Sequence, residues 1–211
     1  MTLINSLIQN GYLKTPEIIR AFKKINRKDF LLPEYKSETE IDEALPIGYG
    51  QTISQPATVA FMFELLQPKA GDKILDIGSG SGWTTTLLAE IVGNQGKVYG
   101  IERILEIKNF GEENILKYDF IKTGRAEIIY GDGYAGLPEH APFDKILVSA
   151  AALETPLELL AQLGIKGKMV IPVGKQYESQ EIVLYTKTSK NKFKIEHFSG
   201  FVFVPLLKDK T

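Results

Sequence analysis

The chain has 211 residues, a formal net charge of −1 and no cysteine. This length suits one medium domain, and the near-neutral charge offers no polybasic surface for nucleic acid or for a membrane. Without cysteine, disulfides, thiolate zinc sites and a cysteine nucleophile are excluded. No apolar run approaches the roughly 18 residues of a membrane span, and the N-terminal stretch does not resemble a signal peptide, so we expect a cytoplasmic protein.

The first part of the chain, residues 1–56, is predicted to be a helical extension that ends in a loop. Within it, Ile18, Phe22 and Ile25 fall on one face at helical spacing. Residues 26–43 are charged and are expected to wind over the surface. They lead into a loop with the sequence LPIGYGQTISQP.

The remainder, residues 57–211, has the pattern of an α/β core in which short apolar strands alternate with helices. The predicted strands are residues 73–77, 97–101, 126–130, 145–150 and 168–173, and the predicted helices are residues 83–92, 104–122 and 157–163. Such alternation indicates a parallel sheet covered on both faces. Residues 181–187 and 193–206 are expected to add an antiparallel edge, in an order that the sequence leaves open. The predicted fold is therefore a doubly wound, mostly parallel seven-stranded sheet within a single domain.

A glycine-rich turn with the sequence GSGSG, residues 78–82, follows the first predicted strand and precedes a helix. In open α/β sheets ligands bind where strands end, and glycine lets the backbone approach a ligand closely. The dinucleotide fingerprint is G-x-G-x-x-G, whereas here the third glycine comes one position early. Asp76 precedes the turn, and its carboxylate would repel a pyrophosphate yet suit the cationic amino group of a methionine moiety. These features favour S-adenosyl-L-methionine over a nicotinamide dinucleotide.

Two further acidic residues follow the next two strands. Glu102 ends its strand, where a carboxylate can accept hydrogen bonds from both ribose hydroxyls; the alternative is a surface glutamate. Asp132 follows the third strand, and its carboxylate or a neighbouring backbone N–H could hydrogen-bond the adenine amino edge. An ordinary turn aspartate is the alternative there.

Six stretches of the chain form a larger set of motifs. They are LPIGYGQTISQP (45–56), ILDIGSGSG (74–82), GKVYGIERI (96–104), GDGYAGLPEHAPFDKILVSAAA (131–152), IPVG (171–174) and FVPL (203–206). In this order and spacing the chain closely resembles protein-L-isoaspartate (D-aspartate) O-methyltransferases. Many methyltransferases share the glycine-rich turn, whereas GQTISQP is more specific because it belongs to this family's substrate loop.

The resemblance implies methyl transfer from S-adenosyl-L-methionine to the α-carboxylate of an L-isoaspartyl or D-aspartyl residue. The cofactor is converted to S-adenosyl-L-homocysteine, and the methylated carboxylate is an ester. This ester closes spontaneously to a succinimide, whose hydrolysis returns part of the residue to normal aspartate. The substrates would be damaged proteins and peptides that contain isoaspartate. The protein is expected to be a monomer that uses no metal and binds neither nucleic acid nor membrane.

The resemblance also implies roles for individual residues, with Ser54 as the active residue. Together with Asp76 and Arg103, the residues expected at the cofactor are Gly78, Ser79, Gly80, Glu102, Asp132 and Gly133. Those expected to flank the peptide are Thr52, Ile53, Ser54, Val202 and Val204. The chain departs from the family at Ala57, where an aromatic residue or histidine is frequent, and at Trp83, where tyrosine is common.

The chemistry requires no strong general base, because a carboxylate with a pKa near 4 is already ionised at pH 7. Accordingly, the only histidines, His140 and His197, are interpreted as structural or solvated. Catalysis would rest on alignment and on partial desolvation of the carboxylate, with Ser54 as an orienting hydroxyl. From the sequence alone, Ser54 is also a candidate N-cap for the helix that Pro56 opens.

Three alternatives stay open at this point. A related methyltransferase could act on an aspartate of one specific peptide, or on a small molecule or tRNA. A cofactor-binding protein could have kept the fold and lost catalysis, although the set of Asp76, Glu102 and Asp132 argues against that loss. A nicotinamide oxidoreductase is the weakest alternative because of the shape and charge of the turn.

Overall fold

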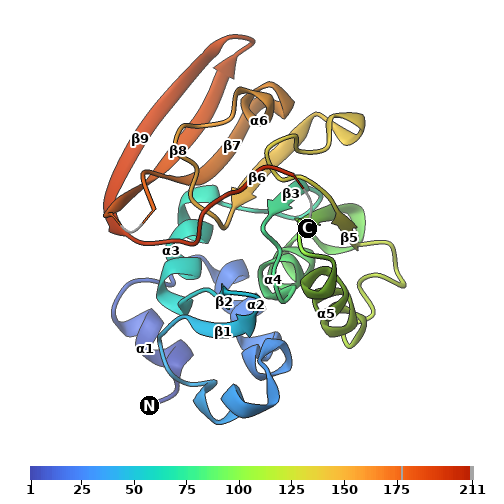
Figure 1. Ribbon diagram of the computed structural model, residues 1–211, viewed down its shortest axis with the longest axis vertical. Coiled ribbons are helices and arrows are strands. Elements are labelled where there is room, and N and C mark those ends of the chain that lie inside the picture. The colour runs from blue at the N-terminus through green and yellow to red at the C-terminus, as the bar shows by residue number, and fades with distance from the viewer. Residues whose placement is uncertain (177, 210–211) are drawn as a thin grey trace.

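Seven strands form the central sheet of the protein. They are β3 (Lys73–Ile77), β4 (Lys97–Glu102), β5 (Ala126–Tyr130), β6 (Phe143–Val148), β7 (Leu163–Val173), β8 (Gln180–Ser189) and β9 (Lys192–Phe201). Their order is β5-β4-β3-β6-β7-β8-β9 (Figure 1). The strands from β5 to β7 run parallel, and β8 and β9 pair antiparallel. The computed structural model describes residues 1–176 and 178–209, and it confirms the predicted mostly parallel sheet with an antiparallel edge.

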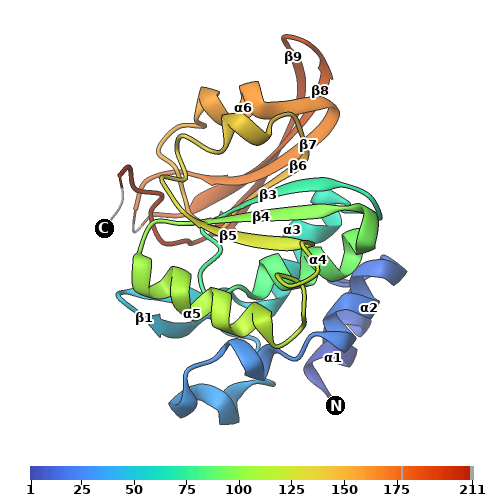
Figure 2. The same cartoon turned by 90° about the vertical axis from the view of Figure 1, so that its right-hand side faces the viewer.

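The inner strands are apolar because helices cover both faces of the sheet. In β3, residues 74–77 are all buried. One face packs against α3 (Pro56–Leu66), α4 (Trp83–Val92) and α5 (Leu105–Leu116), and the other face packs against α6 (Leu157–Gln162) (Figure 2). An apolar cluster fills each of the two interfaces. A sheet buried on both sides needs near-continuous apolar strands, which is the pattern present in the sequence.

The helix α5 is shorter than the predicted helix of residues 104–122. It ends at Leu116, and Asp119 then adopts a left-handed backbone conformation with φ of +58°. Beyond this turn Phe120 packs into the core, and its carbonyl accepts a hydrogen bond from the backbone N–H of Arg125. The residues after Leu116 therefore form a packed loop that leads into β5.

Two helices precede the α/β core, α1 (Leu3–Gln9) and α2 (Pro16–Lys24). The predicted apolar face of the second helix is confirmed, since Ile18, Phe22 and Ile25 are all buried. The helix α2 packs against α3 and α4, so the N-terminal extension adds to the core beneath the sheet (Figure 2).

The segment of residues 26–43 is more buried than predicted. The segment contains two short 3₁₀ helices, η1 (Arg27–Phe30) and η2 (Pro33–Glu38). Others lie further along the chain, namely η3 (Gly93–Gln95) and η4 (Pro138–His140). Arg27, Phe30 and Leu31 are each no more than 5% exposed. The expectation of a surface segment is wrong for these three residues, because two adjacent apolar side chains draw η1 into the core together with the arginine, whereas residues 32–43 are exposed or half-buried as expected.

The loop before α3 contains a small hairpin that the sequence did not predict. It pairs β1 (Leu45–Gly48) with β2 (Gln51–Ile53). The two residues between the strands, Tyr49 and Gly50, both have positive φ, of 53° and 70°. This conformation matches the two-residue turn whose twist suits a hairpin. Ile47 points inward from β1 and is buried.

The last part of the chain leaves the sheet earlier than predicted. The expected strand of residues 193–206 ends at Phe201, after Gly200 with φ of +99°. The chain then crosses to the ends of the parallel strands (Figure 1). There the backbone N–H of Ala151 donates to the carbonyl of Val204, and the N–H of Leu206 donates to the carbonyl of Ala151.

Candidate active site

A cavity opens at the carboxyl ends of the parallel strands, beside the point where the strand order reverses between β3 and β6. Open α/β sheets bind their ligands at such a position. The cavity has an empty volume of about 730 Å³, which includes space open to solvent. Its lining comes from the strand ends, from the β1–β2 hairpin and from residues 204–207 of the C-terminal segment.

The glycine-rich turn forms the floor of this cavity. Gly78, Gly80 and Gly82 all have positive φ, of 75°, 54° and 85°. Each position therefore favours glycine for its backbone conformation. A Cβ atom at Gly80 would also lie 3.4 Å from Cδ1 of Ile47 in the hairpin. The three alternating glycines thus shape a narrow floor below the hairpin.

Glu102 lies on the cavity wall at the end of β4 and is only 6% exposed. Its Oε2 accepts a hydrogen bond from the N–H of Gly80 at 3.1 Å, and its Oε1 accepts from the N–H groups of Arg103 and Ile104 at 2.8 and 3.0 Å. Burial raises the pKa of this carboxyl, while the three backbone donors favour its ionised form. The carboxylate fixes the turn against β4, and it reaches the cavity as an acceptor for hydroxyl groups.

Asp76 lies beneath the turn and does not line the cavity. Its Oδ2 accepts hydrogen bonds from the hydroxyls of Thr84 and Thr85 at 2.8 and 2.7 Å. Its Oδ1 is buried and has no hydrogen-bond partner among the described residues. Burial, the largest effect, raises the pKa of Asp76 to about 6. The structure therefore places this carboxylate below the turn that contacts the cavity.

Two residues after β5 were predicted to contact the cofactor, and only one of them lines the cavity. Gly133 lines the cavity, and a Cβ atom there would lie 2.5 Å from Cγ2 of Ile77. Asp132 does not line it, and its Oδ1 accepts a hydrogen bond from the N–H of Tyr134 at 2.8 Å. The aspartate carboxylate thus stabilises the turn that presents Gly133.

The substrate loop brings its predicted residues to the cavity. Thr52, Ile53 and Ser54 all line it. A second hollow adjoins the cavity and is lined by Val202 as well as by residues that the two spaces share. The shared residues are Thr52, Ser54, Ser149, Val204 and Pro205. Ser54 therefore stands on the wall between a deep cavity and an adjoining outer hollow.

The interpretation of Ser54 as a helix cap is wrong. The N-cap of α3 is Gln55, whose side chain makes no capping hydrogen bond. Instead, Oδ1 of Asp42 accepts a hydrogen bond from the N–H of Ala57 at 2.8 Å. The Ser54 hydroxyl makes no hydrogen bond with any described residue, so it is available to a ligand.

The sequence departs from the family pattern at Ala57 and Trp83, and these two residues have different surroundings. Ala57 is 5% exposed and packs in the core next to the loop. Trp83 lines the cavity from the start of α4, and its Nε1 has no hydrogen-bond partner among the described residues. The guanidinium of Arg27 lies 5.5 Å from the centre of the Trp83 ring.

Sequence reasoning missed several residues that line the site or lie next to it. Arg27 and Asp42 belong to the segment expected on the surface, and Ser149 follows β6. Leu206 lines the cavity although it was expected at the end of a strand. The usable signals were the stretches of residues 131–152 and 203–206, in which the resemblance assigned no role to Ser149 or Leu206.

The histidines lie outside the cavity and the hollow. The ring of His140 stacks on Tyr99 with a centroid distance of 4.3 Å, and Nδ1 of His197 lies 3.0 Å from a carboxylate oxygen of Glu181. Residues 1–176 and 178–209 contain no group of three or more acidic or histidine side chains that could hold a metal ion. Within the same residues, no helix has the length and apolar character needed to cross a membrane.

Comparisons with known proteins agree with this arrangement. The protein-family model that matches residues 1–211 describes protein-L-isoaspartate(D-aspartate) O-methyltransferases. The chain belongs to this family. A protein-L-isoaspartate O-methyltransferase from Flavobacterium psychrophilum is 46% identical over 210 residues, which cover 99% of this chain and 93% of that protein. One from Aeropyrum pernix is 39% identical over 207 residues, covering 98% and 78%.

A solved structure of a family member from Plasmodium falciparum, in complex with S-adenosyl-L-homocysteine, matches this fold with a TM-score of 0.88. It is 27% identical, and the match covers 98% of this chain and 97% of that chain. As a member of the family the protein is a methyltransferase, and its cofactor is S-adenosyl-L-methionine.

The residues of the cavity fit this cofactor. A glycine floor without Cβ atoms admits a ligand close to the backbone, and Glu102 supplies an acceptor for hydroxyl groups. Six of the eight residues expected at the cofactor line the cavity: Gly78, Ser79, Gly80, Glu102, Arg103 and Gly133.

Proposed function

We propose that the protein methylates the α-carboxylate of L-isoaspartyl and D-aspartyl residues in damaged proteins and peptides, and so initiates their repair through a succinimide. The observation that carries this proposal is the outer hollow that adjoins the cofactor cavity, with Ser54 on the shared wall. The hollow has an empty volume of about 1510 Å³ against about 730 Å³ for the cavity, so the hollow has room for a peptide segment and the cavity for a small molecule.

The residues around the deeper cavity would hold the cofactor at the carboxyl ends of the strands. Glu102 accepts hydrogen bonds from ribose hydroxyls, and the backbone at Gly78, Gly80 and Gly133 forms the close-fitting floor. When bound, S-adenosyl-L-methionine supplies an electrophilic methyl group on a sulfonium. The residues of the chain then have to align a carboxylate with that methyl group and limit its contact with water.

Ser54 is proposed to do this alignment. Its hydroxyl makes no hydrogen bond with the described residues and stands where the two spaces meet, so it can donate a hydrogen bond to the substrate carboxylate or to the adjoining backbone. Thr52 and Ile53 would flank the peptide on one side, and Val202 and Val204 on the other. Since the substrate carboxylate is already ionised, the chain needs to hold no proton-accepting group there.

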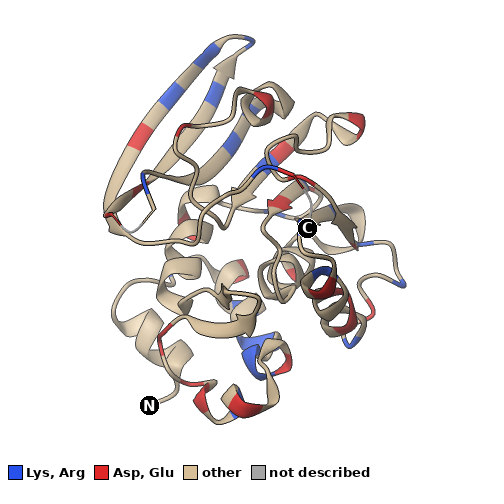
Figure 3. Ribbon diagram, in the orientation of Figure 1, with Lys and Arg blue, Asp and Glu red and all other residues tan. Residues whose placement is uncertain are grey.

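We further propose that the protein acts as a cytoplasmic monomer in which residues 1–56 contribute the substrate loop and residues 57–211 the cofactor-binding core. Lysine, arginine, aspartate and glutamate occur on both helices and strands (Figure 3). The chain as a whole is nearly neutral, which disfavours nucleic acid and anionic membranes as partners. An enzyme for one specific peptide and an inactive cofactor-binding protein are the alternatives that the assay below separates.

The test uses radiolabelled S-adenosyl-L-methionine and peptide pairs that differ only in carrying aspartate or isoaspartate at one position. We expect base-labile label in the isoaspartyl member of each pair and none in the aspartyl member. Incorporation into only one of many isoaspartyl sequences would support the specific-peptide enzyme. Cofactor binding in calorimetry without any incorporation would support the inactive protein.

The role of Ser54 is tested by Ser54→Ala. Loss of a hydrogen bond to a charged group should lower kcat by about 10- to 100-fold, while the cofactor affinity measured by calorimetry stays within about twofold. Ser37→Ala, at an exposed serine away from the site, is the matched control. Equal losses of turnover and cofactor affinity in Ser54→Ala would contradict an orienting role.

A further inference from the structure

Arg27 is a buried arginine that holds the backbone of the substrate loop. Its Nη1 donates a hydrogen bond to the carbonyl of Ile41 at 2.9 Å, and its Nη2 donates to the carbonyl of Glu43 at 2.6 Å. The same Nη2 also reaches the carbonyl of Ser54 at 3.5 Å. One planar guanidinium therefore connects the segment before β1 to the residue that faces the substrate.

In the sequence, Asp42 lies between Ile41 and Glu43, the two residues whose carbonyls are nearest to the Arg27 guanidinium. Its Oδ1 accepts from the N–H of Ala57 at 2.8 Å, and its Oδ2 accepts from Nε2 of Gln55 at 3.3 Å. In this way Asp42 provides at the start of α3 the hydrogen bond that a serine cap would otherwise provide. The consequence is that the Ser54 hydroxyl is left for the substrate, while the Ser54 carbonyl is bound by Arg27 and the next residues, Gln55 and Ala57, are bound by Asp42.

The guanidinium also contacts the wall of the cofactor cavity. It lies 5.5 Å from the centre of the Trp83 ring, a distance within the range of a cation–π contact. Trp83 lines the cavity that holds the cofactor. Arg27 therefore lies between two walls that must be in register during the reaction, the cofactor wall at Trp83 and the substrate wall at Ser54.

Burial of this cation is costly for the fold. Arg27 is 5% exposed, and its Nε has no hydrogen-bond partner among the described residues. Burial lowers the pKa of Arg27 to about 10, and Asp42 counteracts part of that effect, so the side chain stays protonated at neutral pH. A well-packed apolar residue commonly gives a fold as much stability as a buried ionic group does, and the geometry points to a use in holding the loop.

We propose that Arg27 is a positioning residue of this enzyme, which fixes the Ser54 backbone relative to the cofactor wall. The proposal rests on the role of Ser54 proposed above. Arg27 lines neither the cavity nor the hollow, so it acts through Ser54 and does not touch the substrate. Its planar fork is the essential feature, because two separate nitrogens bind the three carbonyls, whereas lysine has a single ammonium nitrogen.

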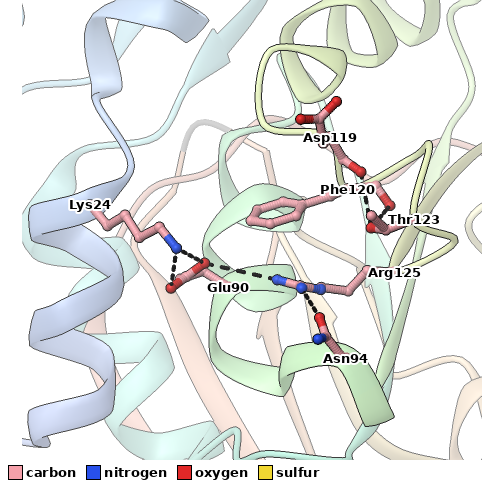
Figure 4. Close-up of polar contacts among 7 residues, drawn as sticks. All are labelled: Lys24, Glu90, Asn94, Asp119, Phe120, Thr123 and Arg125. Carbon is pink, nitrogen blue, oxygen red and sulfur yellow. Dashed lines mark hydrogen bonds and ion pairs between the residues drawn. The ribbon is translucent and has the colours of Figure 1, made fainter.

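The test variant is Arg27→Lys, which keeps the charge and removes the fork. Its matched control is Arg125→Lys, at a second largely buried arginine (Figure 4). Arg125 donates to the side chain of Asn94, pairs with Glu90 at 3.9 Å and lies 4.7 Å from the Phe120 ring. It lines neither the cavity nor the hollow. Both variants should lower the melting temperature, so stability alone does not distinguish them.

Kinetics with the isoaspartyl peptide should distinguish them. In Arg27→Lys we expect kcat to fall by about tenfold or more, because small misplacements of a reacting group are costly, with cofactor affinity within about twofold. In Arg125→Lys both quantities should stay near wild type. Wild-type kcat in Arg27→Lys, or an equal fall of kcat in both variants, would overturn the proposal.

A double-mutant cycle then shows whether Arg27 acts through Ser54. If it does, adding Arg27→Lys to Ser54→Ala should lower kcat by less than about twofold. If the two effects multiply in full, the positioning proposal fails and the role of Ser54 stands. Wild-type kcat in Ser54→Ala alone would contradict the role of Ser54 itself, and with it the positioning proposal.

Discussion

Two buried carboxylates at the cofactor turn are stabilised in different ways. Glu102 accepts three backbone N–H hydrogen bonds, which stabilise its ionised form. Asp76 accepts two hydroxyl hydrogen bonds on one oxygen and none from described residues on the other. Glu102 also raises the pKa of Asp76 by like-charge repulsion. The charge of Asp76 is therefore the less stable of the two.

The first prediction concerns the pH dependence of stability in Asp76→Asn. The carboxyl of Asp76 ionises near 3.8 in the unfolded chain and at about 6 in the folded protein. Between these values the unfolded chain releases its proton first, so the wild type loses stability as the pH rises from 3.8 through 6. Asparagine does not titrate. We expect the melting temperature of Asp76→Asn, relative to wild type, to rise over this interval and then to level off.

Thermal unfolding followed from pH 4 to pH 8 measures this difference. The control is Asp119→Asn, at an exposed aspartate whose left-handed backbone asparagine also tolerates. A relative melting temperature of Asp76→Asn that is flat across the interval would show that burial does not raise the pKa of Asp76.

At the scale of elements, α5 approaches the glycine-rich turn closely enough at Gly111 for backbone atoms to meet. A Cβ atom at Gly111, in the middle of α5, would lie 2.6 Å from the carbonyl oxygen of Gly80. A Cβ atom at Gly82 would lie 2.8 Å from the carbonyl oxygen of Gly111. Both neighbours are backbone atoms, so neither contact can be relieved by turning a side chain. The helix therefore sets the position of the cavity floor.

The second prediction is that Gly111→Ala weakens cofactor binding. Alanine in a helix interior normally adds about 0.5–1 kcal/mol of stability relative to glycine, but here it must displace the turn. We expect a lower melting temperature and a cofactor affinity reduced by about tenfold. Asn109→Ala, at an exposed position of the same helix, should leave both unchanged or slightly raise stability. Unchanged cofactor affinity in Gly111→Ala would contradict a rigid contact.

The same contacts show what sequence patterns could predict. The strands and the cofactor turn were predictable, because apolar runs and alternating glycines are local signals. The role of Gly111 was not, since its reason lies in the carbonyl of Gly80. The burial of Arg27 was likewise hidden in a charged segment, and the function of Asp42 as a cap became visible only once α3 and the preceding segment lay together.

For the whole molecule, the two ends of the chain close the cofactor cavity over the strand ends. The hairpin near the end of the N-terminal extension contributes Ile47, and the C-terminal segment contributes residues 204–207. Leu206 also packs in the apolar cluster on the α6 face of the sheet. The hairpin and the C-terminal segment thus cover part of the cavity at the carboxyl ends of the strands.

The last prediction is that Leu206→Ala loosens this closure. Leu206 is 9% exposed and lines the cavity. Its backbone N–H donates a hydrogen bond to the carbonyl of Ala151 at 2.7 Å, which fixes its position. Its truncation should cost about 2 kcal/mol and lower the melting temperature by about 4–8 °C. S-adenosyl-L-homocysteine should dissociate about fivefold faster or more, because the cavity loses part of its cover. Leu157→Ala, at a leucine that is 75% exposed on α6, should change neither quantity. A stability loss in Leu206→Ala with unchanged product dissociation would mean that the C-terminal segment supports the core and does not close the site.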